Sequence, residues 1–232
     1  MIPVLSTDPE APFPAIDTAL EYPRGLLAAG GDLSPERLVN AYRHGIFPWY
    51  SEGDPILWWS PVPRCVLFPG RVHISRRLRR HYNQGNFRVT ADQAFKLVIA
   101  ACAEKRADNA GTWISDDMRV AYIRLHERGV AHSVEVWKDD KLVGGIYGLA
   151  LGSVFFGESM FSRVTDASKV ALVALCQQLQ QWNYSLLDCQ ISNPHLNSMG
   201  AEELSRTEFK RQLRNTGKAD HWKDTFTLTS RW

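Results

Sequence analysis

The chain has 232 residues, 44% hydrophobic and 22% charged, which suits one large globular domain or a small domain joined to a medium one. It contains no run of about 18 apolar residues, and its first residues lack the basic segment of a signal peptide, so neither a membrane span nor secretion is expected. Four cysteines without a C-x-x-C pair and seven scattered histidines predict no disulfide framework and no metal site. We expect a cytoplasmic protein without a cofactor.

The formal net charge of +2 conceals an uneven distribution of charge along the chain. Residues 64–106 contain ten Lys and Arg residues but only two Asp and Glu residues, whereas the remainder is acidic. The basic excess is highest at Arg76, Arg77, Arg79 and Arg80. Such a cluster favours a polyanionic partner, although a solvated helix face would explain an isolated cluster equally well.

Residues 1–62 are rich in Pro, Gly and aromatic side chains and are predicted to form a small N-terminal domain. One helix within it is well marked. Ser34 is its expected N-cap, Pro35 occupies the first helical position, and Gly45 ends it. The rest of this region is predicted to be short strands and turns.

Residues 63–232 alternate between strand and helix patterns and are predicted to form a second domain. Thr90 and Gln93 have the spacing of a capping box, which predicts a helix that continues to about Arg106. Ser115 is expected to cap a second helix. The further expected elements are strands over 133–137, 142–150 and 153–161, a helix over 166–182, a strand over 185–191, a short helix within 193–201, and a last helix opened by Ser205-x-x-Glu208.

This order of elements resembles the core of the GNAT acyltransferases, so we expect an α+β protein with a mixed sheet. In that fold two neighbouring strands splay apart into a V, where the acyl donor meets the amine acceptor. The corresponding strands here would be 153–161 and 185–191. The turn 162–168 lacks the glycine that helps such enzymes cradle the pyrophosphate of coenzyme A, so a coenzyme A donor is not expected.

A carboxylate in the middle of the apolar strand 153–161 is costly unless it has a partner or a function. If side chains alternate strictly, Phe156, Glu158 and Met160 share one face, where an acid beside an apolar wall could hold an amine next to an apolar acyl group. The alternative is a Glu on the solvated face of an edge strand.

The next polar pair lies in strand 185–191. Asp188 and Gln190 would share a face while Cys189 points away, and a carboxylate beside an amide could orient an amine and help to deprotonate it. A polar pair that merely closes the end of a strand is the alternative.

Aromatic side chains form a third set of candidates, which includes Tyr42, Trp49 and Trp113. They could stack on an unpaired base, although a small domain also needs large aromatic side chains for its own core.

Several separate segments of the chain resemble the leucyl/phenylalanyl-tRNA–protein transferase family over roughly residues 20–210. These segments are GLLAAGGDLS (25–34), GIFPW (45–49), ILWWSP (56–61), HISR (73–76), GTWI (111–114), HSVEVW (132–137), LVGGIYG (142–148), GESMFS (157–162) and DCQ (188–190).

The resemblance implies a small N-terminal domain joined to a GNAT-like domain. It implies transfer of Leu or Phe, less efficiently Met, from aminoacyl-tRNA to proteins that begin with Arg or Lys, which marks them for N-end rule degradation. By the same resemblance the catalytic residues are Glu158, Asp188 and Gln190. The residues that hold the 3′ adenosine are Tyr42, Trp49 and Trp113, and those that line the pocket for the donor's side chain are Phe155 and Met160. The tRNA is bound by Arg76, Arg77, Arg79 and Arg80.

Because the ester of aminoacyl-tRNA is already activated, no covalent enzyme intermediate is required. We expect Gln190, oriented by Asp188, to contact the attacking amine and Glu158 to hold the cationic N-terminus of the acceptor. The alternatives to this function are a GNAT-type acetyltransferase of a small amine and a non-catalytic RNA-binding module.

Overall fold

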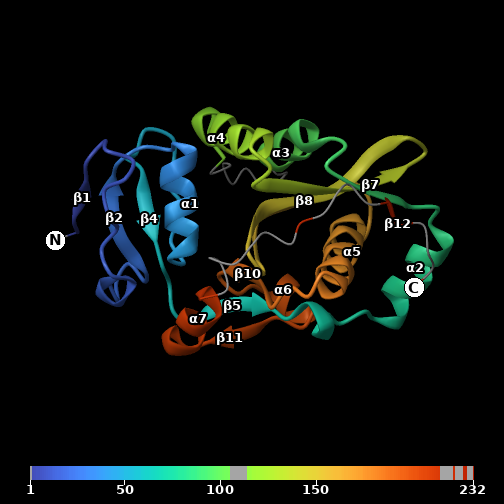
Figure 1. The fold of residues 1–232 in the computed structure, drawn as a ribbon. Coiled ribbons are helices and arrows are strands. Elements are labelled where there is room, and N and C mark those ends of the chain that lie inside the picture. Colours follow the sequence, from blue (N-terminus) through green and yellow to red (C-terminus); the bar gives the residue numbers. More distant parts are fainter. Residues whose placement is uncertain (1, 105–113, 215–221, 223–226, 229–231) are drawn as a thin grey trace.

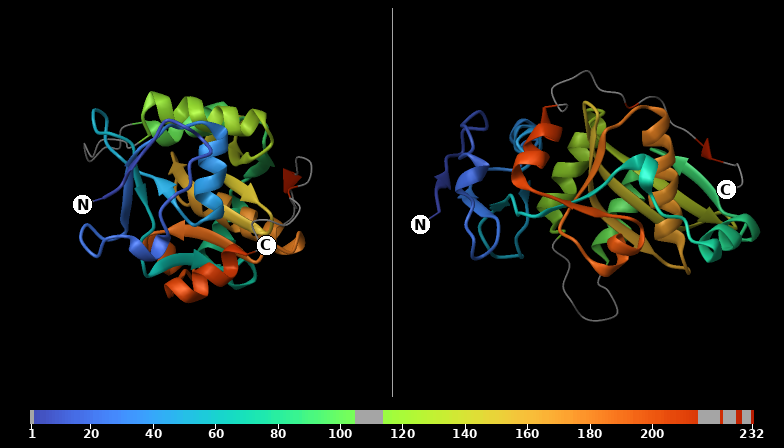
Figure 2. Two further views of the ribbon diagram at one scale, coloured as in Figure 1. Left: turned by 60° about the vertical axis from the view of Figure 1, so that its left-hand side comes forward. Right: turned by 90° about the horizontal axis from the view of Figure 1, so that it is seen from below.

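The computed structural model describes residues 2–104, 114–214, 222, 227–228 and 232, which form two sheets with helices around them (Figures 1 and 2). The first sheet has the strand order β1-β2-β4-β3 and lies within the N-terminal 62 residues. Its elements are β1 (Val4–Leu5), a 3-10 turn (Ile16–Thr18), β2 (Leu26–Gly30), α1 (Pro35–Arg43), β3 (Phe47–Pro48) and β4 (Leu57–Trp59).

Helix α1 begins as the sequence predicts. The hydroxyl of Ser34 accepts a hydrogen bond from the Arg37 backbone amide, and Pro35 takes the first helical position. Gly45 follows the helix with a φ of +74°, in the left-handed region that favours glycine. The apolar face of α1 contains Leu38 and Tyr42, which are completely buried.

The second sheet has eight strands in the order β11-β5-β10-β9-β8-β7-β6-β12. Strand β10 pairs parallel with β9 and antiparallel with β5, whereas β9, β8, β7 and β6 pair antiparallel in succession. The predicted α+β class with a mixed sheet is therefore confirmed. Its strands are β5 (Arg64–Leu67), β6 (Arg88–Ala91), β7 (Ala131–Lys138), β8 (Lys141–Leu151), β9 (Val154–Ser162), β10 (Leu186–Gln190), β11 (Glu202–Leu204) and β12 (Thr227–Leu228).

The capping box predicted at Thr90 is wrong. Thr90 lies in β6 opposite Glu135 of β7, and its hydroxyl donates a 2.5 Å hydrogen bond to that carboxylate. Helix α3 (Phe95–Ala103) begins five residues later, after Ala94, which provides no side-chain cap. The local Thr-x-x-Gln pattern is overridden here by pairing between strands that are 45 residues apart in sequence.

The other predicted helix starts are confirmed. Ser115 caps α4 (Asp116–Glu127), and Ser205 and Glu208 form the capping box of α7 (Arg206–Leu213). The remaining helices are α2 (Arg76–Gln84), α5 (Ala167–Gln181), α6 (Pro194–Ser198) and a second 3-10 turn (Pro69–Arg71). Within the described part of the chain, no helix is both long and apolar enough to cross a membrane.

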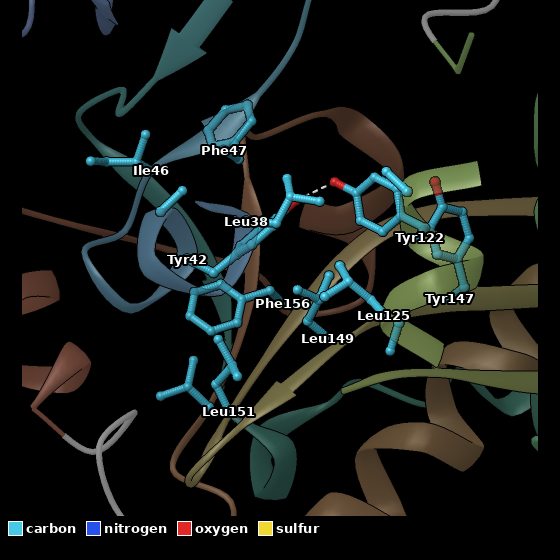
Figure 3. Close-up of a cluster of buried hydrophobic side chains, with 14 of the residues drawn as sticks. Leu38, Tyr42, Ile46, Phe47, Tyr122, Leu125, Tyr147, Leu149, Leu151 and Phe156 are labelled. Carbon is cyan, nitrogen blue, oxygen red and sulfur yellow. Dashed lines mark hydrogen bonds between the residues drawn. The ribbon is translucent and has the colours of Figure 1, made fainter. Parts of the chain in front are cut away.

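The helices cover the two faces of the large sheet. Helices α3 and α4 lie on one face and α5 lies on the other (Figure 1). The core on the α3–α4 side is continuous with the interior of the N-terminal region, because Leu38, Tyr42 and Trp58 belong to the same buried cluster as Tyr122 and Phe156 (Figure 3). The two regions predicted as separate domains, residues 1–62 and 63–232, thus share one hydrophobic core.

Candidate active site

Strands β9 and β10 run side by side only at their beginnings. Their parallel pairing extends from Leu186 and Val154 to Asp188 and Phe156, after which β9 continues along β8 and β10 bends towards β5. A pocket of about 770 Å³ lies where they part, as the V-shaped sheet predicts. The pocket is lined by residues 157–163 of β9 and the turn after it, Leu187, Cys189 and Gln190 of β10, Asn193, His195 and Leu196 near α6, Ala101, Cys102 and Glu104 near α3, Ile146 of β8, and Ser168 and Leu172 of α5.

Glu158 occupies a bulge in β9. Gly157 and Ser159 pair with the consecutive residues Gly148 and Tyr147 of β8, so Glu158 has no partner in the ladder. The extra residue reverses the alternation of side chains. Phe156 therefore packs with the α3–α4 core, whereas Met160 packs on the α5 side, and the prediction that these two residues share a face is wrong.

The carboxylate of Glu158 faces the hydroxyls of two tyrosines, Tyr42 and Tyr122, which lower its pKa against the effect of burial. The hydroxyl of Tyr122 donates a 2.8 Å hydrogen bond to Oε2, and the hydroxyl of Tyr42 lies 2.5 Å from that of Tyr122 (Figure 3). Because Tyr122 has a single proton to donate, the chain runs from Tyr42 through Tyr122 to Glu158. Oε1 is buried and has no hydrogen-bond partner among the described residues. Burial raises the pKa of Glu158 to about 7.

Asp188 does not face the pocket, contrary to the prediction that it shares a face with Gln190. Its two carboxylate oxygens accept hydrogen bonds from Nε and Nη2 of Arg64, at 2.8 and 2.7 Å, and both side chains are buried. Oδ1 also accepts a 3.0 Å bond from the backbone amide of Gln190. Asp188 therefore holds the backbone of Gln190, and its buried carboxylate does not line the pocket.

A second bulge explains this arrangement. Asp188 pairs with Val66 of β5 and Gln190 pairs with Cys65, so the single residue Cys189 is inserted between them. Gln190 adopts a φ of +58° and lines the pocket, where its amide nitrogen is buried without a partner among the described residues.

Of the predicted site residues, three line this pocket: Glu158, Met160 and Gln190. The other predicted site residues that the structure describes do not line it. Phe155 is buried in the core on the α5 side of the sheet, next to Trp222, and does not line the pocket. Tyr42 is completely buried, so its ring has no exposed face on which a base could stack. Trp49 is 43% exposed and packs against Trp59. Trp113 lies outside the described residues.

The four arginines of the basic cluster lie on α2, which Ser75 caps. Leu78 and Tyr82 anchor the helix to the core, and all four arginine side chains are exposed. Within the described ranges, none of the four forms an ion pair with an acidic side chain.

Sequence reasoning missed three polar residues of this region. Arg64 and Tyr122 fix the two acids, and His195 lines the pocket with a buried Nε2 that has no hydrogen-bond partner among the described residues. Burial, together with the nearby charge of Lys169, lowers the pKa of His195. An Arg within the apolar strand Arg64-Cys65-Val66-Leu67 is a signal that a buried acid must lie opposite, which would have identified the Arg64–Asp188 pair.

Comparison with known proteins gives consistent matches over most of the chain. A family profile described as leucyl/phenylalanyl-tRNA protein transferase matches residues 66–214, and a profile for the N-terminal domain of that family matches residues 31–62.

Curated proteins named leucyl/phenylalanyl-tRNA–protein transferase are 53–59% identical to the chain. The protein from Stutzerimonas stutzeri is 59% identical over 201 residues, which cover 87% of this chain and 89% of the relative. The protein from Cellvibrio japonicus is 58% identical and covers 92% of this chain and 90% of the relative. The protein from Nitrosomonas europaea is 53% identical and covers 100% and 99%.

Solved structures resemble the chain only weakly. A GCN5-related N-acetyltransferase from Kribbella flavida has a TM-score of 0.35 at 14% identity and covers 74% of this chain and 61% of its own.

Proposed function

The chain belongs to the leucyl/phenylalanyl-tRNA protein transferase family, and on that premise we propose that it transfers Leu or Phe, less efficiently Met, from aminoacyl-tRNA to proteins that begin with Arg or Lys. Its membership makes it an aminoacyltransferase that moves an aminoacyl group from tRNA to a protein. The further proposal is that this happens in the cytoplasm and that the new N-terminus marks the acceptor for N-end rule degradation.

The observation that carries the proposed mechanism is the environment of Glu158. The attacking group is an α-amine, whose reference pKa is about 7.7–8.0, so most of it is protonated at neutral pH and must lose a proton before or during attack. A general base is most effective when its pKa lies near the working pH. Burial gives Glu158 a pKa of about 7, and Glu158 lines the pocket with a buried Oε1 that has no hydrogen-bond partner among the described residues.

This environment changes the expected division of labour among the acids. Asp188 is buried, paired with Arg64 and bonded to the backbone amide of Gln190, so we assign it a positioning role in which it fixes the backbone of Gln190. The side-chain amide of Gln190 would then bind the acceptor amine. Glu158 would take its proton and, when ionised, attract the cationic N-terminus of the acceptor.

The transfer step forms one bond and breaks one. The amine nitrogen attacks the ester carbonyl carbon, and the bond between that carbon and the ribose oxygen breaks. The protonated amine loses two protons as it becomes the amide nitrogen. One is released to solvent, and Glu158 takes the other and returns it to the leaving ribose oxygen, so the enzyme emerges unchanged. Approximation of the two substrates in the pocket can supply roughly 7–11 kcal/mol of the barrier reduction, and base catalysis about 10²–10⁴-fold.

The donor side chain would lie against the apolar wall of the pocket. Met160, Ile146 and Leu172 contribute to this wall, which suits Leu and Phe and rejects a charged side chain because its charge would be desolvated. Phe155, which is buried in the same α5-side core against which Met160 packs, would act only by supporting that wall. Trp49 stays our candidate for contact with the 3′ adenosine. The exposed arginines of α2 would bind the phosphates of the tRNA.

The direct test supplies the protein with labelled Phe-tRNA or labelled acetyl-coenzyme A, together with peptides that begin with Arg, Lys or Ala. We expect label from Phe-tRNA on the Arg and Lys peptides and none from acetyl-coenzyme A. Transfer from acetyl-coenzyme A alone would establish the acetyltransferase alternative. Equal labelling of the Ala peptide would contradict the proposed acceptor choice, and Glu158→Gln should weaken the preference for Arg over Ala.

A further inference from the structure

Two cysteines face each other directly beside the pocket. Cys65 lies in β5 and Cys189 in β10, and these strands pair antiparallel. Because Asp188 pairs with Val66 and Gln190 with Cys65, the bulge leaves Cys189 and Gln190 together opposite the single residue Cys65. In such a bulge the two residues on the longer strand share one partner on the shorter strand.

Both thiols lie on the α5 side of the sheet. Cys65 belongs to the buried cluster on that side, and Cys189 packs against the same cluster while it also lines the pocket. The neighbouring Cys189 thiol lowers the pKa of Cys65, and the Cys65 thiol, with burial, raises the pKa of Cys189, whose thiol also lies 3.9 Å from the Leu187 carbonyl oxygen. The pair therefore loses its first proton more readily than an isolated buried thiol does, because the remaining thiol stabilises the thiolate.

The strand pairing also sets the distance between the two backbones. Facing residues in an antiparallel pair have Cα atoms about 4.5–5.5 Å apart, and a disulfide bridges Cα atoms about 4.4–6.8 Å apart. A bridge between Cys65 and Cys189 consequently requires no large movement of either strand.

We propose that Cys65 and Cys189 form a reversible disulfide when the protein meets a hydroperoxide, and that this bond stops aminoacyl transfer by displacing Gln190. The formation of the bond is independent of the proposed function, whereas its effect on transfer rests on that function. The pocket gives a small oxidant a route to Cys189.

The chemistry is balanced within the pair and the peroxide. The thiolate of one cysteine attacks a peroxide oxygen, breaks the O–O bond, and becomes a sulfenic acid, while the departing hydroxide takes up a proton to form water. The second thiol then attacks the sulfenic sulfur, and the hydroxyl group leaves with the thiol proton as a second water. Two electrons pass from the two sulfurs to the peroxide, and a dithiol reductant reverses the bond.

The expected effect on transfer follows from the neighbours of Cys189. The next residue, Gln190, has a left-handed backbone, and its amide donates a hydrogen bond to Asp188. A covalent pull on Cys189 would rotate this backbone and move the Gln190 amide out of the pocket. Misplacement of a catalytic group by about 1 Å can cost on the order of 10²-fold in rate.

The reduced protein is exposed to hydrogen peroxide and divided into two samples. One is unfolded in an alkylating reagent for measurement of its mass and its linked peptides. The other is assayed, still folded, for transfer of Phe to an Arg peptide. We expect loss of two hydrogen atoms, a link between the peptides that contain Cys65 and Cys189, and a decrease in kcat/KM of at least about tenfold. Dithiothreitol should restore both thiols and the activity, which distinguishes the disulfide from methionine oxidation at Met160.

Two variants assign the link. Trypsin leaves Cys176 and Cys189 on one peptide, because no Lys or Arg lies between Lys169 and Arg206. The Cys176→Ala variant should therefore keep the link, whereas Cys65→Ala should abolish it and retain full activity in peroxide. Cys176 is a matched control because its burial raises the pKa of its thiol to about 12, which leaves almost no thiolate.

Several results would overturn the inference. The first is four intact thiols after peroxide treatment. The second is a loss of two hydrogen atoms that persists in Cys65→Ala. The third is complete formation of the link without loss of transfer. A reduced wild-type protein that transfers no Phe would instead refute the proposed function, and the mass and peptide data would still decide whether the disulfide forms.

Discussion

Glu158 is the residue in which burial and chemistry are most directly connected. Its carboxylate has one oxygen bonded to Tyr122 and the other without a described partner, and burial raises its pKa from 4.5 to about 7. In the unfolded chain the same group would titrate near its ordinary value. Between these two pKa values the folded protein binds a proton that the unfolded chain does not, so folding becomes less favourable as the pH rises.

Glu158→Gln should therefore stabilise the protein in a pH-dependent manner. Below about pH 4.5 both side chains are neutral and the two proteins should be equally stable, whereas above pH 7 the variant should gain up to about 3 kcal/mol of unfolding free energy. Urea unfolding of both proteins at several pH values measures this difference. A difference that does not change with pH would mean that the carboxylate is not forced to carry a buried charge.

The buried ion pair of Arg64 and Asp188 gives a second prediction at this scale. Asp188→Asn leaves the Arg64 charge without its counter-ion and should cost about 3–5 kcal/mol of unfolding free energy. Combining it with Arg64→Met should recover much of that loss, since no charge is then left unpaired. Urea unfolding of the two single variants and the double variant provides the cycle. Additive losses would show that the two charges do not stabilise each other.

The sequence identified Glu158, Gln190 and Met160 as pocket residues, but it could not give the orientation of every side chain. Strict alternation would place Phe156 and Met160 on one face, and Asp188 and Gln190 on another. Each strand contains one inserted residue, which shifts the alternation, and a bulge depends on the pairing with a neighbouring strand rather than on local sequence. The partner of Asp188 is 124 residues away, beyond the reach of any local pattern.

At the scale of the elements, the bulge in β9 depends on a glycine in β8. A Cβ atom on Gly148 would lie 2.0 Å from the backbone oxygen of Phe156, whereas one on Gly157, its partner across the ladder, would be 3.5 Å from its nearest neighbour on Leu187. Neither glycine has a positive φ, so the two positions differ only in available space.

Gly148→Ala should consequently lower the unfolding free energy by more than about 2 kcal/mol and disturb Glu158, whereas Gly157→Ala should change stability by less than about 1 kcal/mol. Thermal or urea unfolding of the two variants measures the contrast. Equal stability of the two alanine variants would show that the backbone of the bulge adapts freely.

Helix α2 carries the proposed contacts with tRNA phosphates. The double change Arg76→Ala and Arg80→Ala should raise the KM for Phe-tRNA, leave a minimal aminoacyl-adenosine donor almost unaffected, and reduce the slope of log affinity against log salt by about 1–2 units. Binding titrations at several salt concentrations measure that slope. An unchanged slope would assign these arginines to an ordinary solvated surface.

The helices show where sequence patterns are dependable. Serine caps predicted α1, α4 and α7 because a cap is a local hydrogen bond between residues three apart. Thr90 has the same local signature, but it hydrogen bonds to Glu135 on the neighbouring strand instead. The short strands β5 and β11 escaped prediction because each is stabilised by its neighbours in the sheet rather than by its own residues.

For the whole molecule, the N-terminal region and the large sheet function as one packed unit. Tyr42 of α1 and Tyr122 of α4 link the N-terminal region to Glu158, and their rings belong to one continuous core (Figure 3). Helix α2 lies at the opposite end of the molecule from the N-terminal region (Figures 1 and 2). The proposed tRNA contacts on α2 therefore lie at one end of the molecule. The N-terminal region, whose Tyr42 supports the proposed base, lies at the other end.

The pH dependence of a single turnover tests the central claim most directly. Limiting Phe-tRNA and an excess of an Arg peptide are mixed with an excess of wild-type protein or of Glu158→Gln, and the rate of peptide labelling is measured from about pH 5.5 to 8.5. We expect the wild-type rate to rise with pH through an apparent pKa of about 7, because only the ionised carboxylate can accept the proton. The variant should lose most of its rate and retain only the rise that follows the acceptor amine itself, whose pKa is about 7.7–8.0. A variant that keeps both the wild-type rate and the same rise would show that Glu158 is not the base.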